Sequence, residues 1–400
     1  MIEQTEELRD ERPSAPRDDD ERVDDGAGDG SRVESGMALA LSGGGYRAML
    51  FHVGCLWRLN ELGILPHLKR ISSVSGGSIT AALLGINWSR LGFNNQGVAI
   101  HFDQAVVQPI RSLADRTIDI PAILTGILLP CVTISDRIAA AYDKYLYHGA
   151  TLQNLPHCSP RFVINATSLQ TGTLWRFSQP YMADYRVAQY GTPNLPIALA
   201  VAASSAFPPV LSPVRIDIHK LQPLPNSRGP FFLPPYNRTV LAADGGVYDN
   251  LGIETIWKRY RTLLVSDGGG RMQCQPRPPI FWPCQTVRVL DVIDNQVRSL
   301  RKRQLMDAFK LRTIHDGAYW SIRTPITDYQ TSEALSCPSA RTQQLAAVKT
   351  RLAALDSQLQ ERLINWGYAV CDAAVRSTTR GLGWTIVTRA PSFPYPASTV

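Results

Sequence analysis

Short apolar runs, each followed by glycine, dominate the region from 37 to 91. The first run, 37–41, leads into three consecutive glycines. From 46 to 62, apolar side chains recur at a spacing that places them on one face of a helix. A second run, 71–74, leads into another helical pattern at 76–91. The pattern predicts a strand–helix–strand–helix unit with a glycine-lined turn after each strand.

Both turns are expected to open at the same edge of a sheet. A right-handed crossover between parallel strands brings the carboxyl ends of both strands to one edge. The amides of Gly44 and Gly45 would therefore face Ser75, which follows the second strand. Acyl transfer requires such an arrangement, because the amides stabilise the charge that develops on a carbonyl oxygen beside the attacking hydroxyl.

Further strands and helices are predicted along the rest of the chain. Runs typical of strands occupy 161–166, 174–178, 240–243, 262–266 and 287–291. A helix of small residues is expected at 197–204, and one with an arginine-rich face at 293–311. A leucine-rich stripe from Leu345 to Trp366 predicts another helix, which Gly367 would end. Strands that alternate with helices are typical of an α/β protein.

Charge divides the chain into an acidic start and a basic remainder. Residues 1–36 contain 13 Asp/Glu and 5 Lys/Arg, which leaves 36 of the 41 Lys/Arg and 21 of the 34 Asp/Glu for the rest, a net charge of +15. We predict a disordered acidic tail at 1–36, a catalytic domain at 37–325 and a helical extension packed on it at 326–400. The basic body favours an anionic membrane surface as partner over nucleic acid, for which the chain carries no recognised motif.

The sequence has no feature of a secreted or membrane-spanning protein. Seven cysteines, without CxxC spacing, indicate neither a disulfide framework nor a zinc site, and the start lacks a signal peptide. The longest charge-free apolar stretch near the middle, 120–135, is interrupted by Pro121 and Pro130 and is shorter than the about 20 residues of a transmembrane helix. We expect a cytoplasmic or peripheral membrane protein, with the apolar patches 231–236 and 281–282 either in contact with lipid or packed inside.

The first glycine turn also matches a dinucleotide-binding fingerprint formally. Gly43, Gly45 and Ala48 stand at the three small-residue positions of that motif. The fingerprint requires an acid at the end of the next strand to bind a ribose hydroxyl, whereas Ser75 stands there. An oxyanion hole therefore fits this turn better, with Arg47 either holding the loop or lying near an anionic head group.

Ser75 has the surroundings of a nucleophile elbow. In such a turn the serine is held in a strained backbone between a strand and a helix, so its neighbours must be small. Gly76 and Gly77 follow it, and Ser73 stands where the motif has its first glycine. The first amides of the following helix also favour negative charge at this point. These features predict Ser75 as a nucleophile.

Asp244 is the first candidate for the base that activates Ser75. It ends a predicted strand, where a base in an open parallel sheet is expected, and Gly245 and Gly246 leave room for the serine. A serine–aspartate dyad needs the carboxylate within hydrogen-bond reach of the hydroxyl and a pKa raised by burial. Asp267 stands in the same local context and is the main competitor.

A histidine-based triad is the alternative to the dyad. Ser75, Asp244 and His315 follow the chain order of the α/β-hydrolases. In that fold more than one crossover separates the oxyanion strand from the elbow, whereas a single crossover separates them here. The spacing therefore favours the dyad.

These motifs, in this order, resemble those of the patatin-like phospholipases. Gly43-Gly44-Gly45-Tyr46-Arg47 matches that family's GGGxR oxyanion motif, Ser73–Gly77 its GxSxG elbow, and Asp244-Gly245-Gly246 its DGG motif. The resemblance covers about 37–266 and favours Asp244 over Asp267 as the base. It implies a three-layer α/β sandwich with a mainly parallel central sheet and helices on both faces.

The resemblance also implies an activity, the hydrolysis of an acyl ester in a phospholipid or related lipid without a metal or cofactor. Ser75 would be acylated, Asp244 would take and return the proton, and water would release the fatty acid. The chain departs from the family pattern at Ser73 and Ala48, both small residues that we expect to be tolerated with reduced turnover. A non-catalytic lipid-binding or regulatory protein that keeps the fold is the alternative.

Overall fold

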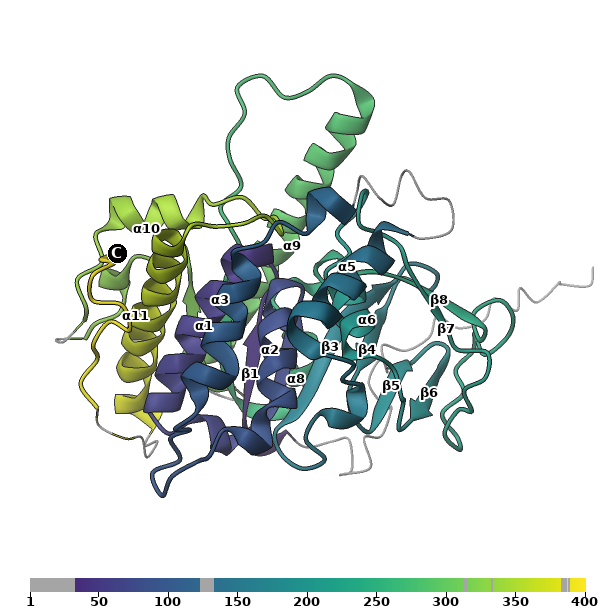
Figure 1. Ribbon diagram of the computed structural model, residues 1–400, viewed down its shortest axis with the longest axis horizontal. Coiled ribbons are helices and arrows are strands. Elements are labelled where there is room, and N and C mark those ends of the chain that lie inside the picture. The colour runs from purple at the N-terminus through teal and green to yellow at the C-terminus, as the bar shows by residue number, and fades with distance from the viewer. Residues whose placement is uncertain (1–32, 123–132, 312–314, 332–333, 383–386, 388) are drawn as a thin grey trace, which may run out of the picture.

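A central sheet lies between two layers of helices (Figure 1). The computed structural model describes residues 33–122, 133–311, 315–331, 334–382, 387 and 389–400. The acidic tail predicted at 1–36 therefore falls almost entirely outside the described residues. The arrangement confirms the predicted three-layer α/β architecture, with a sheet that is mixed.

The parallel half of the sheet carries the two glycine turns. Its strands are, in spatial order, β10 (Asp316–Ser321), β9 (Tyr260–Asp267), β1 (Glu34–Leu41), β2 (Leu68–Val74) and β3 (Arg161–Ser168). Helix α1 (Gly45–Glu61) connects β1 to β2, and α2 (Gly76–Ile86) follows β2. Because Leu41 at the end of β1 pairs with Ser73 near the end of β2, the two turns lie side by side. The predicted strand–helix–strand–helix unit is confirmed.

The antiparallel half of the sheet brings Asp244 to the elbow from an unexpected direction. Its strands are β4 (Leu174–Phe177), β5 (Tyr181–Asp184), β6 (Ala188–Gly191), β7 (Val214–Asp217) and β8 (Thr239–Asp244). The expectation that Asp244 ends a parallel strand is wrong, because β8 runs antiparallel to β3. Asp244 pairs with Ala166, next to Asn165, which itself pairs with Val74. Strand β8 therefore ends close to Ser75.

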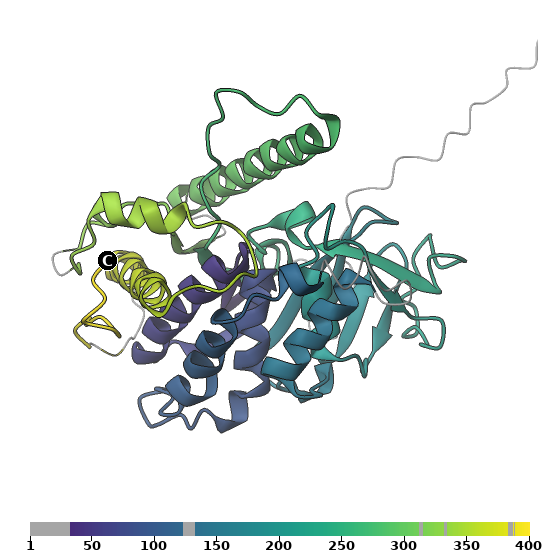
Figure 2. The same cartoon turned by 45° about the horizontal axis from the view of Figure 1, so that its top comes forward.

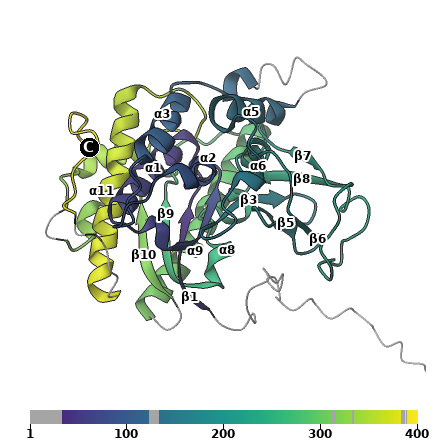
Figure 3. The ribbon, with the colours of Figure 1, turned by 60° about the horizontal axis from the view of Figure 1, so that its bottom comes forward.

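The two faces of the sheet pack against different helices. Leu39 and Leu41 of β1 belong to the larger core, which α1, α2, α6 (Ile197–Ser204) and α11 (Ser357–Leu382) cover. Ala38 and Ala40 point to the opposite face, where α8 (Glu254–Trp257) and Leu305 of α9 (Trp282–Leu311) pack. In Figure 3, α11 lies beside α1, far from the antiparallel strands β5 to β8.

Residues 282–311 form one helix, α9, rather than a strand followed by a helix. The strand predicted at 287–291 is wrong. Neither glycine nor proline separates this apolar run from the helical pattern at 293–311, so the helix continues through it. Only Arg298 and Leu305 of α9 are buried, and the start of the helix stands away from the body (Figure 2).

Gly367 lies inside helix α11 and does not end it. The stripe predicted from 345 to 366 is divided between α10 (Ser339–Ala346) and α11. A side chain at Gly367 would lie 1.9 Å from the carbonyl oxygen of Phe51, and one at Gly54 would lie 1.9 Å from that of Ile364. Both glycines thus allow α1 and α11 to cross closely, a long-range constraint that a helix-stop rule does not consider.

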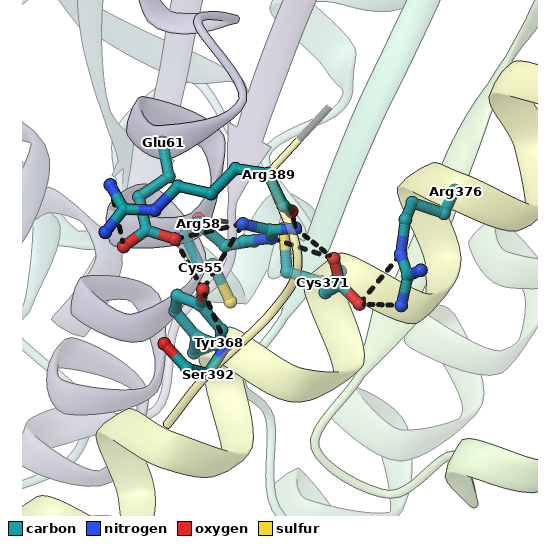
Figure 4. A network of polar contacts seen from close by, with 9 residues as sticks. Cys55, Arg58, Glu61, Tyr368, Cys371, Arg376, Arg389 and Ser392 are labelled. Atoms are coloured by element: carbon teal, nitrogen blue, oxygen red, sulfur yellow. Dashed lines mark hydrogen bonds and ion pairs between the residues drawn. The ribbon is translucent and has the colours of Figure 1, made fainter. Parts of the chain in front are cut away.

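A buried polar network also joins α11 to α1 (Figure 4). The fully buried Arg58 guanidinium donates to Asp372 Oδ1 at 2.8 Å and to Glu61 Oε2 at 2.9 Å. Tyr368 donates its hydroxyl hydrogen to Glu61, and Arg376 pairs with Asp372. Loss of one partner would leave an uncompensated buried charge, which typically costs about 3–5 kcal/mol. This contact attaches the predicted extension, whose boundary at 326 stays a prediction.

Candidate active site

Ser75 occupies a strained turn between β2 and α2. Its backbone has φ = 50° and ψ = −120°, a conformation that non-glycine residues rarely adopt. Its amide donates to Ser204 Oγ of α6 at 2.9 Å, which supports the turn. A side chain at Gly76 or Gly77 would lie 2.3–2.4 Å from the backbone oxygens of the neighbouring glycine turn and strand. The small residues are therefore required by the close packing of the two turns.

Ser73, which departs from the family motif, is accommodated by hydrogen bonds. Its buried hydroxyl accepts from Ser78 Oγ at 3.0 Å and donates to the carbonyl oxygen of Val163 at 3.3 Å. Ser78 Oγ also lies 2.9 Å from Ser204 Oγ, the group that holds the amide of Ser75. The hydroxyl at 73 therefore extends the support of the elbow.

Asp244 lies directly beside Ser75. Its carboxylate accepts a hydrogen bond from the amide of Gly246 at 2.7 Å, and the Ser75 hydroxyl is close enough to lower the pKa of the carboxyl group. The side chain is buried, and burial raises the pKa of Asp244 to about 7 although the Gly246 amide and the Ser75 hydroxyl both lower it. A side chain at Gly245 would lie 2.4 Å from the carbonyl oxygen of Asn165, so the turn after Asp244 also has no room for a larger residue.

The glycine turn after β1 contains two backbone amides that no described group accepts from. Gly44 and Gly45 adopt φ values of 145° and 61°, and neither amide has a hydrogen-bond partner among the described residues. Gly43, by contrast, donates its amide to the carbonyl oxygen of Asn250 at 3.1 Å. Of the three predicted glycines, Gly43 therefore has no amide to offer an oxyanion.

Arg47 ties two loops to the glycine turn. Its Nε donates to the carbonyl oxygen of Gly268 at 3.2 Å, and its Nη1 donates to that of Val348. Burial, reinforced by the nearby Arg298, lowers the pKa of Arg47 to about 10, so the side chain stays charged at neutral pH. Of the two predicted roles, holding the loop is the one for which the structure has contacts.

Asp267, the competing candidate base, is fully engaged elsewhere. Its carboxylate accepts from the amide of Gly269 at 2.9 Å, the hydroxyl of Tyr319 at 2.8 Å and the guanidinium of Arg323 at 3.3 Å. Burial raises the pKa of Asp267, but Arg298 and Arg323 outweigh that effect and hold the pKa below its ordinary value. A carboxylate held in this way is a poor proton acceptor.

His315 lies at the opposite edge of the sheet, and this excludes the triad. Its Nδ1 lies 3.2 Å from the carbonyl oxygen of Tyr260, and its ring packs against Trp257 at 4.3 Å between centroids. The histidine precedes β10, whose first residue pairs with Thr262 near the start of β9. The elbow, in contrast, lies at the carboxyl ends of the parallel strands.

A cavity of about 760 Å³ opens above Ser75 and Asp244. Besides the two motifs, its walls come from the loops at 205–211 and 269–275, from α9 and from the segment 346–352. The last segment is attached to the glycine turn, because the amide of Tyr46 donates to the carbonyl oxygen of Arg351 at 3.0 Å. The candidate nucleophile, base and free amides thus share one cavity.

Comparison with known families shows which family the chain belongs to. The profile of the patatin-like phospholipases matches residues 39–257, which is more than half of the chain. The chain belongs to the patatin-like phospholipase family. The match spans the glycine turn, the elbow and Asp244.

Two solved structures resemble this patatin-like chain at low sequence identity. Human GIVD cytosolic phospholipase A2 has a TM-score of 0.47 at 12% identity, over 87% of this chain and 61% of the human one. VipD from Legionella pneumophila has a TM-score of 0.36 at 15% identity, over 86% of this chain and 67% of VipD. The chain thus spans less than two thirds of the matched human protein. A comparison with curated proteins finds no match.

Two polar residues of the patatin-like site were not predicted. Asn250 Nδ2 donates to Asp294 Oδ1 at 3.2 Å, and both residues line the cavity. Burial raises the pKa of Asp294, against the effect of Arg298. Asn250 follows the DGG motif closely enough to have been suspected, whereas Asp294 reaches the site only because α9 folds over it.

None of the helices in the described part of the chain combines the length and apolarity needed to cross a bilayer.

Proposed function

We propose that the chain is a lipid acyl hydrolase in which Ser75 is the nucleophile and Asp244 the base. The observation that carries the proposal is the position of the buried Asp244 carboxylate beside Ser75, in the same cavity and close enough for the serine hydroxyl to lower its pKa. A base with a pKa of about 7 can take a proton and return it at neutral pH with little loss in either direction. Membership of the patatin-like phospholipase family supports the same reaction.

In the first half of the reaction, Ser75 Oγ attacks the carbonyl carbon of the acyl ester while Asp244 takes the hydroxyl proton. The negative charge on the carbonyl oxygen is stabilised by the amides of Gly44 and Gly45, each typically worth about 2.7–4 kcal/mol of the barrier. When the intermediate collapses, the ester C–O bond breaks, and Asp244 gives the proton to the departing alcohol. The acyl group remains on Ser75.

In the second half, water attacks the acyl-serine carbonyl and transfers a proton to Asp244. Collapse of this intermediate breaks the bond to Ser75 Oγ, which recovers the proton from Asp244, and releases the fatty acid. The same two amides stabilise both intermediates, since the oxyanion forms at the same place. No residue outside the dyad needs to change its protonation state.

The cavity supports an acyl lipid as the substrate class. Its volume of about 760 Å³ lies within the range of roughly 300–1,000 Å³ that is usual for small-molecule sites. Phe207, Val210 and Leu211 contribute apolar side chains to its wall, against which a hydrocarbon chain would pack. Arg271 and Arg288 line it as well and suit an anionic head group.

A fluorophosphonate probe tests the proposal, because it reacts with activated serines and leaves ordinary serines unlabelled. We expect an adduct on the peptide that contains Ser75, no adduct in Ser75→Ala, and strongly slowed labelling in Asp244→Asn. His315→Ala, the matched control for the triad, should be labelled like the wild type. Mass spectrometry of a mixed lipid panel should then show release of fatty acid by the wild type alone. Absence of the adduct from Ser75 would favour a non-catalytic lipid-binding protein.

A further inference from the structure

The start of helix α9 and the loop before it form an arm that stands away from the body (Figures 1 and 2). The second half of α9 is anchored, since Arg298 and Leu305 are buried. The far end of the arm carries Ile280, Phe281 and Trp282, which are 92%, 66% and 72% exposed. We call these three residues the arm tip. The patch predicted at 281–282 is therefore not packed inside the protein.

Exposed apolar side chains are concentrated on this arm. Of the sixteen large apolar side chains that are exposed in the described residues, six lie between 280 and 293. Single exposed apolar residues are ordinary on a protein surface, but three consecutive large ones at the end of a projection indicate a binding surface.

The charge of the arm is one-sided. From 268 to 290 the chain contains Arg271, Arg277 and Arg288 and no aspartate or glutamate. Arg288 donates to the carbonyl oxygen of Gln273 at 2.8 Å, which fastens the loop to the helix. The arm therefore carries three arginines close to its apolar tip. Because the loop is already held to the helix, it does not have to become ordered when the tip binds a partner.

The arm is continuous with the candidate active site. Val287, Asp291 and Asp294 of α9 line the cavity, so the arm rises directly from its wall. Across the cavity, Phe207 and Val210 also line the wall and are 38% and 46% exposed. A surface that bound the arm tip would therefore lie close to the mouth of the cavity.

We propose that the arm tip inserts into the surface of an anionic phospholipid membrane and so holds the mouth of the cavity against it. Tryptophan prefers the interface between head groups and hydrocarbon, and each basic residue near an anionic surface adds attraction. The net charge of +15 after residue 36 acts in the same direction. The inference specifies where the substrate of the proposed function would come from, but the binding itself does not depend on catalysis.

Vesicle binding by the full chain tests this inference. With Ser75→Ala, so that the lipids stay intact, we expect binding to vesicles of phosphatidylcholine and phosphatidylglycerol and weaker binding to phosphatidylcholine alone. Phe281→Ser/Trp282→Ser should weaken binding at least about tenfold, because two side chains lose their apolar contact with lipid. Arg277→Gln should weaken it about fivefold, and high salt should abolish that difference.

A matched control is an exposed isoleucine outside the arm. Ile100 is 65% exposed and lies beyond the end of α2, away from the cavity. Ile100→Ser should leave vesicle binding unchanged, whereas Ile280→Ser should weaken it. Equal binding by the wild type and Phe281→Ser/Trp282→Ser would overturn the inference. The inference is equally wrong if these substitutions only dissociate a homodimer, because the tip would then bind a second copy of this chain.

Insertion, as distinct from attraction, is tested with brominated lipids that quench tryptophan fluorescence. Trp282→Phe should still bind the vesicles but lose most of the quenching, because none of the other tryptophans among the described residues is exposed. Quenching that is unchanged in Trp282→Phe would overturn the inference.

Hydrolysis of a short-chain water-soluble ester, measured with an intact Ser75, separates the two proposals. Suppose that the arm variants still hydrolyse the soluble ester and that all of them bind vesicles as the wild type does: then only the membrane inference fails. Suppose instead that the probe never labels Ser75 but that vesicle binding still requires the arm tip: then only the proposed function fails.

Discussion

The two Asp-Gly-Gly turns of the chain have the same local structure and different chemistry. In each, an aspartate ends a strand and accepts a hydrogen bond from the amide two residues on, at 2.7 Å for Asp244 and 2.9 Å for Asp267. Both carboxylates are buried. The local motif therefore does not distinguish them.

The charged residues around the two aspartates do distinguish them. Asp267 lies beside Arg298 and Arg323 and stays ionised, whereas within the described residues no cation pairs with Asp244. Burial without a compensating charge raises the pKa of Asp244 to about 7. Asp244, with no paired cation, is thus a candidate base, whereas Asp267 forms ion pairs with its neighbouring arginines.

The largest effects are expected when each carboxylate is neutralised in turn, which tests whether the two aspartates differ in role. Asp244→Asn should lower kcat for ester hydrolysis by about 10²–10⁴-fold or more, since the serine loses its proton acceptor. Asp267→Asn should keep most of the activity but unfold more easily, by about 3 kcal/mol, because Arg298 and Arg323 lose their partner. Steady-state kinetics and urea unfolding measure the two effects. Equal losses of activity would show that the two turns are not chemically distinct.

The pH dependence of stability should also differ between the two aspartates. The pKa of Asp244 is 3.8 in the unfolded chain and about 7 in the fold, so the folded state holds the proton more tightly. This group therefore makes the free energy of unfolding fall as pH rises from about 4 to about 7. Asp244→Asn should remove that loss and stabilise the protein by on the order of 4 kcal/mol above pH 7.

Thermal unfolding at pH 4 and at pH 8 measures this effect. The variant should exceed the wild type at pH 8 and match it near pH 4. Serine-to-alanine substitution at 75, which leaves the carboxylate in place, should produce no such gain and serves as the control. A gain of equal size at both pH values would mean that it does not come from ionisation.

A smaller effect is expected from the cation beside Asp267. Arg323→Gln should raise the pKa of Asp267 and lower the free energy of unfolding by about 1 kcal/mol at pH 7, since the pair at 3.3 Å is partly exposed to solvent. Because the pKa of Asp267 is lowered in the fold, its stabilising contribution is present at neutral pH and lost as pH falls through that pKa. Wild type and variant should therefore converge in acid, and a difference that persists there would point to packing instead.

The smallest effect concerns Asp294. Its charge contributes to the raised pKa of Asp244, after burial. The pH profile of kcat/KM should rise through about pH 7, and Asp294→Asn should move its midpoint lower by less than about one pH unit. Gln296→Glu on the exposed face of α9 is a control that should leave the midpoint in place. An upward shift in Asp294→Asn would contradict the assignment.

How much was predictable from the sequence depended on the range of the interactions. The strand–helix units around Gly44 and Ser75 follow from short apolar runs and turn glycines, and the structure contains them. The role of Gly367 and the direction of β8 depend on Phe51 and Ala166, which are far away in sequence. Local patterns carry no information about such partners.

The candidate site divides in the same way. Its motifs were recognisable, but the choice between Asp244 and Asp267 came from resemblance to a family, because the residues around each aspartate look alike. The cations that distinguish them, Arg298 and Arg323, belong to α9 and to the turn after β10. The engaged amide of Gly43 also depends on a remote group, the carbonyl oxygen of Asn250.

The attachment of Arg351 to the amide of Tyr46 has a practical consequence for expression of this protein. The family profile ends at 257, but the cavity takes walls from 269–275, α9 and 346–352. A recombinant fragment trimmed to the matched boundaries would keep Ser75 and Asp244 but lose these walls of the cavity. If the proposed function holds, sequence swaps that aim to change the preferred acyl chain should accordingly include this later third together with the loop at 205–211, with the three motifs left intact.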